Sequence, residues 1–301
     1  MEQKKKVYLN PVQVITIALF LFFVFGVKVQ AEQKYVEELK IDNVYIVLAG
    51  EVQDSSEFPQ GVSYSEATNT LTLDNVNVEK VQGTGTADLN IIIKNTSIVQ
   101  KDIFYGADSE EEKGGNINIS GGKLQFTKEL YGYARISTFE DDGVSVQGNI
   151  NLLNMTIESN NGYNLLHTNK GNVSIKNCII KMTNGSGNAI ITQGDQAKIS
   201  ISNSSIETIY SSLANIYYTM MQPEITGMHC YVGEEKAEYE MNKNDFFKEY
   251  NYDYSPYIHH VNFAYVGKYT LLTTEDKHLP QAYRVSVDVD EISSAQVSRC
   301  Y

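Results

Sequence analysis

Several residue types are scarce in this 301-residue chain, and each scarcity narrows the class of protein. The three cysteines, Cys178, Cys230 and Cys300, are too few to build a disulfide scaffold. Cys178 falls within an apolar pattern and is expected to be a small buried side chain, whereas pairing between Cys230 and Cys300 stays open. The chain has no tryptophan, so the largest aromatic face for stacking against a sugar is missing. Only five prolines, among many Asn, Ser, Thr, Ile and Gly, favour strands and turns over long helices.

Positive charge is also scarce. The chain carries 24 Lys and Arg against 37 Asp and Glu, which gives a formal net charge of −13. A chain this acidic is repelled by nucleic acid and by anionic membranes, so we expect neither as a partner. We predict no cofactor and no metal site, because the five histidines show no metal-ligand spacing and the acidic runs lack the spacing of a Ca²⁺ loop.

The N-terminus has the features of a secretory signal peptide. Lys4–Lys6 precede an apolar run from Val14 to Val27, and Val29 and Ala31 are placed as in a signal-peptidase site. The run is shorter than the roughly 20 residues of a membrane-spanning helix, which favours cleavage after Ala31 over an uncleaved anchor. We therefore expect a secreted bacterial protein, extracellular and associated with the cell surface, with no membrane insertion after cleavage. Removing residues 1–31 takes away four lysines and one glutamate and shifts the net charge to −16.

A nine-residue pattern recurs along the middle of the chain. It has two apolar residues spaced by two, then Asn or once Gly, then a third apolar residue three positions later. The six copies are Thr70–Val78, Asn90–Ile98, Asn116–Leu124, Asn149–Ile157, Asn172–Ile180 and Lys198–Ile206. Their starts are 20, 26, 33, 23 and 26 residues apart. A period in this range with one strand-like unit per repeat is typical of a solenoid.

Each copy predicts a strand, a turn and the start of a second strand. In Asn172–Ile180 the alternation places Val173 and Ile175 on a buried face. Asn177 then breaks the alternation, because Asn favours turns and tolerates left-handed backbone. If the copies stack in register, the turn asparagines lie about 4.8 Å apart and can form a hydrogen-bonded ladder.

The linking segments supply a third strand per repeat. They are Asp102–Tyr105, Gly132–Ser137, Gly162–His167, Gly187–Thr192 and Ala214–Tyr218. Three short strands per repeat predict an all-β fold, a right-handed parallel β-helix of about six coils over residues 70–222. Residues 32–69 are expected to form an N-terminal cap and hairpin, and residues 223–301 a C-terminal cap or small β appendage. An antiparallel sandwich is the alternative, but it does not require one pattern six times.

The opening of the repeats carries a resemblance. The run Val62–Asn75 has a tyrosine, a short turn and then Thr-Leu-Thr-Leu-Asp-Asn, and Pro223–Gly233 follows the last copy. Both segments resemble secreted β-helical proteins of Firmicutes that are described as carbohydrate-binding domain-containing, although Asp74 departs from the usual Asn. The resemblance implies the fold and a glycan ligand, and it brings no catalytic motif.

An enzyme on the same scaffold is the second hypothesis. Glycoside hydrolysis needs two carboxylates on one face, yet the repeat places Asp only at Asp74 and Asp88. A polysaccharide lyase would need a cationic base beside a carboxylate-built Ca²⁺ site, and of three arginines only Arg135 lies within the repeats. A third hypothesis is a structural spacer or adhesin shaft. We therefore expect a non-catalytic binding or adhesion module whose partner is an extracellular polysaccharide or cell-wall glycan.

One row in the third strand is the candidate ligand site. We expect the position after the inward residue to face outward on successive coils, next to Arg135. This row comprises Tyr105, Ser137, His167, Thr192 and Tyr218. The ligand-binding residues predicted from it are Tyr105, Arg135, His167 and Tyr218, because rings and hydrogen-bonding groups in 4.8 Å steps suit an extended glycan. An ordinary exposed sheet face is the alternative explanation.

Overall fold

The computed structural model describes residues 34–107, 114–127, 135–138, 148–160, 164–185, 188–192, 196–210, 215–219, 224–225, 227–241, 247–254, 257–265 and 268–274. Within these ranges the chain is all-β with extensive parallel pairing, as the repeat predicts, and its two helical segments are the short 3₁₀ turns η1 (Ser55–Glu57) and η2 (Glu66–Thr68). No helix in the described part is long and apolar enough to span a membrane. The signal-peptide prediction for residues 1–31 lies outside the described residues.

The nine-residue copies form two parallel ladders. The first ladder joins the first halves of the six copies: β5 (Thr70–Asp74), β8 (Leu89–Val99), β10 (Ile117–Phe126), β12 (Ile150–Leu153), β15 (Val173–Lys176) and β18 (Ile199–Ser202). Beyond the last copy, β21 (Glu224–Ile225) pairs with β18 and extends this ladder. The second ladder joins the second halves: β6 (Asn77–Val78), the ends of β8 and β10, β13 (Thr156–Asn160), β16 (Ile179–Gly185) and β19 (Ser205–Tyr210). β8 and β10 run through both ladders and make them one sheet.

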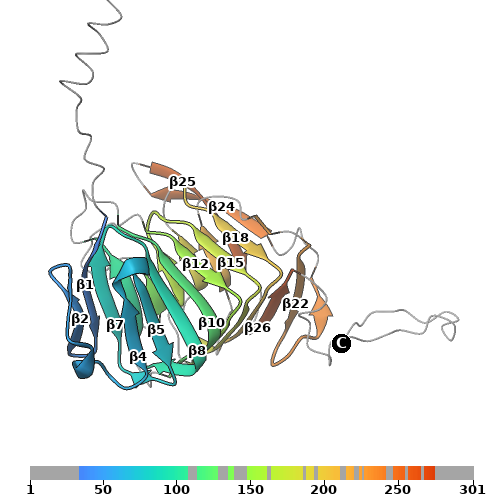
Figure 1. The fold of residues 1–301 in the computed structure, drawn as a ribbon. Helices are drawn as coiled ribbons and strands as arrows, with labels where there is room; N and C mark the ends of the chain where they lie inside the picture. The colour runs from blue at the N-terminus through green and yellow to red at the C-terminus, as the bar shows by residue number, and fades with distance from the viewer. Residues whose placement is uncertain are drawn as a thin grey trace, which may run out of the picture. The chain divides into compact units, whose positions relative to one another are not determined.

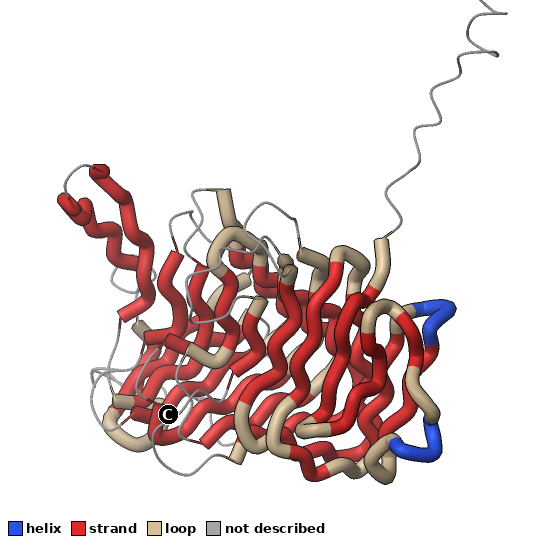
Figure 2. Tube along the Cα trace, turned by 90° about the vertical axis from the view of Figure 1, so that its left-hand side faces the viewer, coloured by secondary structure: helices blue, strands red, loops and turns tan. Residues whose placement is uncertain are grey.

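The linking segments form a third parallel ladder in a separate sheet. Its strands are β7 (Val81–Gly85), β9 (Asp102–Gly106), β11 (Arg135–Ser137), β14 (Leu166–Thr168), β17 (Asn188–Thr192) and β20 (Asn215–Thr219). The chain therefore visits the three ladders in turn and returns to the first about every 20 to 33 residues. Figures 1 and 2 show the resulting rows of neighbouring strands.

Antiparallel strands cover the ends of the ladders. Ahead of the repeats, β1 (Val36–Ile41) pairs with β7, and β4 (Val62–Ser65) forms with β5 the hairpin predicted over Gly61–Leu73. Beyond the repeats, β26 (Tyr269–Thr273) pairs with β19, and β25 (Tyr257–Tyr265) pairs with β20. The remaining outer strands are β2 (Val44–Leu48), β3 (Glu51–Val52), β22 (His229–Gly233), β23 (Tyr239–Glu240) and β24 (Phe247–Tyr254). Paired ends protect the parallel ladders from edge-to-edge association.

Inward side chains of all three ladders form one apolar core. Val173 and Ile175 on the first ladder and Ile180 on the second are buried, as predicted. Ile190 on β17 belongs to the same cluster of buried residues and represents the third ladder. Cys178 and Cys230 are buried free thiols, and burial raises the pKa of both. Cys300 lies outside the described residues.

The turn asparagines adopt left-handed backbone, as predicted. Asn75, Asn95, Asn154, Asn177 and Asn203 have φ between 48° and 55°, and Gly121 takes the same position with φ 87°. The expected side-chain ladder is present over the last three copies, whereas in the second copy Asn95 Nδ2 donates to Asp74 Oδ1 (2.8 Å) and not to Asn75. Asn177 Nδ2 donates to Asn154 Oδ1 (2.8 Å), and Asn203 Nδ2 donates to Asn177 Oδ1 (2.5 Å). The turn therefore combines a backbone preference with bonds between coils.

Replacing Asn177 should separate these two contributions. Asn177→Ala loses both ladder bonds and places in the left-handed region a residue without the polar side chain that lets Asn tolerate it, so we expect a loss of about 2 kcal/mol in the free energy of unfolding. Asn177→Gly keeps the backbone conformation and loses only the ladder, so about 1 kcal/mol is expected. Urea denaturation of both variants measures the difference. Equal losses would show that the left-handed turn contributes nothing to the choice of Asn.

A second asparagine ladder precedes the first strand of each copy, and the sequence pattern did not predict it. The side chain of each residue accepts a hydrogen bond from the backbone N–H of its counterpart in the next repeat. Asn149 N donates to Asn116 Oδ1 (3.0 Å), and Asn172 N donates to Asn149 Oδ1 (2.7 Å). Lys198 N donates to Asn172 Oδ1 at 2.8 Å. These bonds satisfy backbone donors between strands, where the ladders provide no partner.

Candidate functional site

The row expected on the third ladder has a different register from the one predicted. Ser137 pairs with Phe104 on one side and with His167 on the other, and His167 pairs with Ile191. Tyr105 pairs instead with Gly83, and Thr192 with Thr168, so both lie one position away from the row. Because side chains alternate between the faces of a strand, a shift of one residue moves Tyr105 and Thr192 to the opposite face.

The exposure expected for this row is wrong where side chains are described. Tyr105 is fully buried, and its hydroxyl donates to Ala87 O at 2.8 Å within the core. Arg135 is 6% exposed and His167 5% exposed, although both lie on the outer face of the ladder. Tyr218 lies on β20 opposite Ile191, and its side chain is outside the description. Glycan binding by these four residues stays a prediction, but three of them offer almost no surface to a ligand.

Two other segments considered from the sequence are the acidic clusters and the segment that follows the repeats. The acidic clusters at 108–112 and 140–142 lie outside the described residues. Within residues 223–301, where a C-terminal cap or small β appendage was expected, residues 247–254 form strand β24, which pairs with β25. Its alternation of Tyr250, Tyr252 and Tyr254 with polar residues accounts for the strand.

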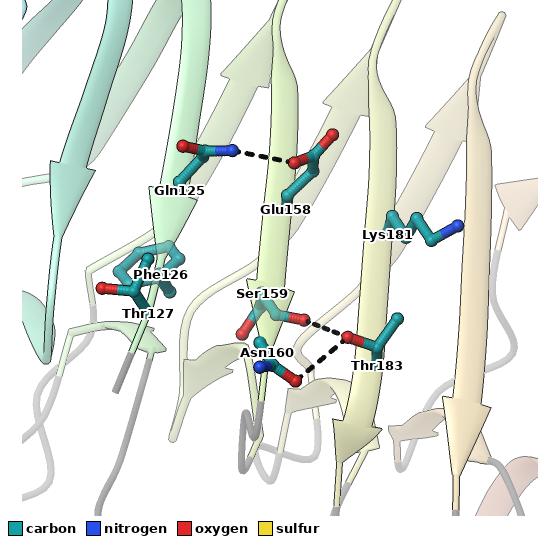
Figure 3. A pocket seen from close by; sticks show the side chains of 8 residues that line it. All are labelled: Gln125, Phe126, Thr127, Glu158, Ser159, Asn160, Lys181 and Thr183. Carbon is teal, nitrogen blue, oxygen red and sulfur yellow. Dashed lines mark hydrogen bonds between the residues drawn. The ribbon is translucent and has the colours of Figure 1, made fainter. Parts of the chain in front are cut away.

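The outer face of the second ladder carries a polar hollow of about 290 Å³. Three neighbouring strands line it: β10 with Gln125 and Thr127, β13 with Glu158 and Asn160, and β16 with Lys181 and Thr183. Gln125, Glu158 and Lys181 lie side by side in one row across the strands. Asn160 and Thr183 lie side by side in a second row on the same face, two residues further along β13 and β16. Figure 3 shows the two rows across the strands. Phe126 also lines the hollow but is 1% exposed, so its ring gives a ligand no free face.

A network of hydrogen bonds holds the side chains of the hollow. Gln125 Nε2 donates to Glu158 Oε2 (2.9 Å), and Lys123 Nζ lies 2.8 Å from Glu158 Oε1. Lys181 Nζ lies 3.0 Å from Glu207 Oε2 on β19. In the lower row Asn160 Oδ1 accepts from the Thr183 hydroxyl (3.2 Å) and from Asn184 Nδ2 (2.9 Å). The hollow therefore presents a carboxylate, an ammonium, amides and hydroxyls in fixed positions.

The carboxylate in the centre of the hollow is held in its ionised form. The hydrogen bond from Lys123 is the main cause that lowers the pKa of Glu158 below its usual value of 4.5. Gln125 and the charges of Lys123 and Lys181 lower it further, and partial burial opposes them. Because the folded pKa is lower than the unfolded one, Glu158 adds stability above about pH 4.5 and loses that contribution as the pH falls through the folded pKa.

Glu158→Gln should therefore flatten the acid side of the stability profile. The Glu158 side chain is 41% exposed, so solvent screening limits its contribution, and we expect a change of less than about 1 kcal/mol. Urea midpoints measured from pH 7 to pH 3 should fall less steeply below pH 4.5 in the variant than in the wild type. Lys123→Met should flatten the profile similarly, because it removes the partner. An unchanged acid limb in both variants would contradict the assigned ion pair.

Sequence reasoning missed this hollow because each of its residues is an ordinary polar residue of an alternating strand. The signal that identifies it is the second strand of consecutive copies, where Gln125, Glu158 and Lys181 recur at the same distance after the turn. Among the described residues, no group of three or more His, Cys, Asp or Glu side chains is arranged to hold a metal ion. No family model, curated protein or solved structure matches this chain.

Proposed function

We propose that this chain is a secreted, non-catalytic β-solenoid that binds an extended glycan on the outer face of its second ladder. In this proposal the three ladders are the walls of a right-handed parallel β-helix, and the signal-like segment 1–31 directs it out of a bacterial cell. The observation that carries the binding function is the hollow, in which polar groups from β10, β13 and β16 lie in register. Strand spacing repeats these groups about every 4.8 Å.

The chemistry of the hollow suits sugar hydroxyls. A hydroxyl both donates and accepts, and the hollow offers acceptors at Glu158 and donors at Lys181. The volume of about 290 Å³ is at the lower end of ligand pockets, and the aromatic ring of the lining residue Phe126 is buried. We therefore expect weak binding per site, with affinity gained from several sugar units along the ladder.

The state of Glu158 favours binding over hydrolysis. A glycosidase needs one carboxylic acid with a raised pKa that donates a proton, beside a second carboxylate. The pKa of Glu158 is lowered by Lys123, which keeps it from acting as a proton donor near neutral pH. Glu207, the next carboxylate along the row, is separated from Glu158 by Lys181 and accepts a hydrogen bond from the Tyr269 hydroxyl (2.8 Å).

A glycan array with the secreted form of the chain tests the proposal. We expect binding to at least one extended bacterial or plant polysaccharide, weakened about tenfold or more by Lys181→Ala. Lys176→Ala is the matched control, because Lys176 is exposed on the outer face of the first ladder, opposite Leu153 and Ser202. Absence of binding at high protein concentration would overturn the proposal and leave a spacer or adhesin shaft. Reducing ends or unsaturated products after incubation with polysaccharides would favour an enzyme.

A further inference from the structure

We propose that the hollow selects neutral sugars and discriminates against uronic acids. This inference rests on the proposed function and names its ligand class. It starts from the charges along the outer row of the second ladder and its neighbour Lys123. Four charged side chains face this surface: Lys123 from β10, Glu158 from β13, Lys181 from β16 and Glu207 from β19.

Each cation of the row is already paired with a carboxylate. Lys123 Nζ lies 2.8 Å from Glu158, and Lys181 Nζ lies 3.0 Å from Glu207. The row and Lys123 together have no net formal charge among the described side chains, and Glu207 also accepts a hydrogen bond from the Tyr269 hydroxyl of β26. An incoming carboxylate can reach a cation only beside the carboxylate that already pairs with it and is repelled by that like charge, whereas a sugar hydroxyl can donate to the carboxylate and accept from the ammonium.

The geometry places a negative charge in the middle of the hollow. Glu158 lies between the strands that contribute Gln125 and Lys181, and 41% of its side chain is exposed to a ligand. Its ionised oxygens accept hydrogen bonds from hydroxyl groups and repel the carboxylate of a uronic acid. One like charge at about 5 to 6 Å changes affinity on the order of a hundredfold in the permittivity near a protein surface and about fourfold in bulk water, so roughly tenfold is expected at this partly exposed site. The net charge of the whole secreted chain acts in the same direction.

Neutral donors and acceptors surround this carboxylate. Asn160 Oδ1 is engaged by Thr183 and Asn184, which orients the amide. The amide nitrogen, Asn160 Nδ2, lies on the side of the amide that faces away from Thr183 (Figure 3). Together with Glu158, it offers one donor and one acceptor about two residues apart along β13, which is about 7 Å. Such a pair matches hydroxyls on opposite sides of a sugar unit.

Paired ligands test this inference separately from glycan binding itself. A neutral hexose oligomer and the uronic acid oligomer of the same linkage are titrated calorimetrically into the secreted chain. We expect the neutral oligomer to bind about tenfold more tightly, with an affinity that changes less than twofold between 50 and 500 mM NaCl. Glu158→Gln should narrow the ratio to about threefold or less. Lys181→Gln should widen it, because the row then carries a net negative charge, and Lys176→Gln should leave it unchanged.

The outcomes distinguish the two proposals. Equal or tighter binding of the uronic acid oligomer, or a ratio unaffected by Glu158→Gln, overturns the selectivity while leaving glycan binding in place. Binding of neither oligomer, in a protein whose array screen is also negative, overturns the proposed function and the selectivity together. A circular dichroism melt of each variant shows that the substitutions leave the fold intact, which we expect because all three side chains lie on the outer face of their ladders.

Discussion

Replacing Gly171 with alanine should lower the free energy of unfolding by about 3 kcal/mol or more. A Cβ on Gly171 would lie 1.8 Å from Gly148 O in the preceding coil. It would also lie 2.7 Å from the Thr168 hydroxyl. That hydroxyl donates to Gly148 O (3.0 Å) and accepts from the Gly171 N–H (2.9 Å). The added methyl group would therefore disrupt both hydrogen bonds, which together connect neighbouring repeats. The two nearest atoms belong to the Gly148 backbone, which cannot move aside as a flexible side chain can.

Thermal and urea denaturation measure this effect. For a unit of this size we expect a fall in Tm of roughly 6 to 12 °C. Ala197 is the matched control, because it precedes Lys198 as Gly171 precedes Asn172 and already carries a Cβ. Ala197→Gly should cost about 1 kcal/mol at most, through the greater freedom of the unfolded chain. A Gly171→Ala protein as stable as the wild type would contradict the close approach of these coils.

The adjacent residues Ile179 and Ile180 should respond very differently to truncation. Ile180 is 1% exposed and packs inward from the second ladder, so Ile180→Ala should cost 2 to 5 kcal/mol through lost burial and a residual cavity. Ile179 is 47% exposed on the outer face, and Ile179→Ala should cost less than about 1 kcal/mol. Both variants remove the same atoms from neighbouring positions, so the comparison isolates the direction of the side chain.

Urea midpoints for the two variants are sufficient for this comparison. A similar loss for both would show that the register of β16 against β13 and β19 differs from the one described, because a slip of one residue exchanges the two faces. A larger loss for Ile179→Ala would show the reversed register directly.

Much of the first and second ladders could be predicted, because the repeated sequence pattern indicates how their strands align. In the last three copies the alternation of apolar residues identifies the inward face, and an Asn with left-handed backbone identifies the turn. Val173, Ile175, Asn177 and Ile180 accordingly lie where the pattern places them. The copy Asn90–Ile98 departs from the pattern, because Ser97 and Val99 are buried in place of Ile98, and Ile91 pairs with Ile119 and not with Ile117. The second asparagine ladder was missed because its members vary between Asp, Asn and Lys, and their function depends on backbone donors in the next coil.

The strands of the third ladder could be predicted from the sequence, but their register against one another could not. Its strands are buried on both faces, as in Leu165–Leu166 and Ile190–Ile191, so apolar residues occupy consecutive positions and no alternation marks the outward side. No turn asparagine of the repeat fixes the phase of Tyr105 or Thr192. The polar hollow depends on the pairing of β10, β13 and β16, and a single strand read alone shows only ordinary alternation.

A crystal structure of the secreted chain with the neutral oligosaccharide that binds it most tightly is the most direct test of the account. We expect a sugar unit between β13 and β16, within hydrogen-bonding distance of the Glu158 carboxylate and the Asn160 amide, on a stack in which Glu158 pairs with Lys181 in parallel register. A sugar bound instead at Arg135 and His167 on the third ladder, or an empty hollow at saturating ligand, would contradict it.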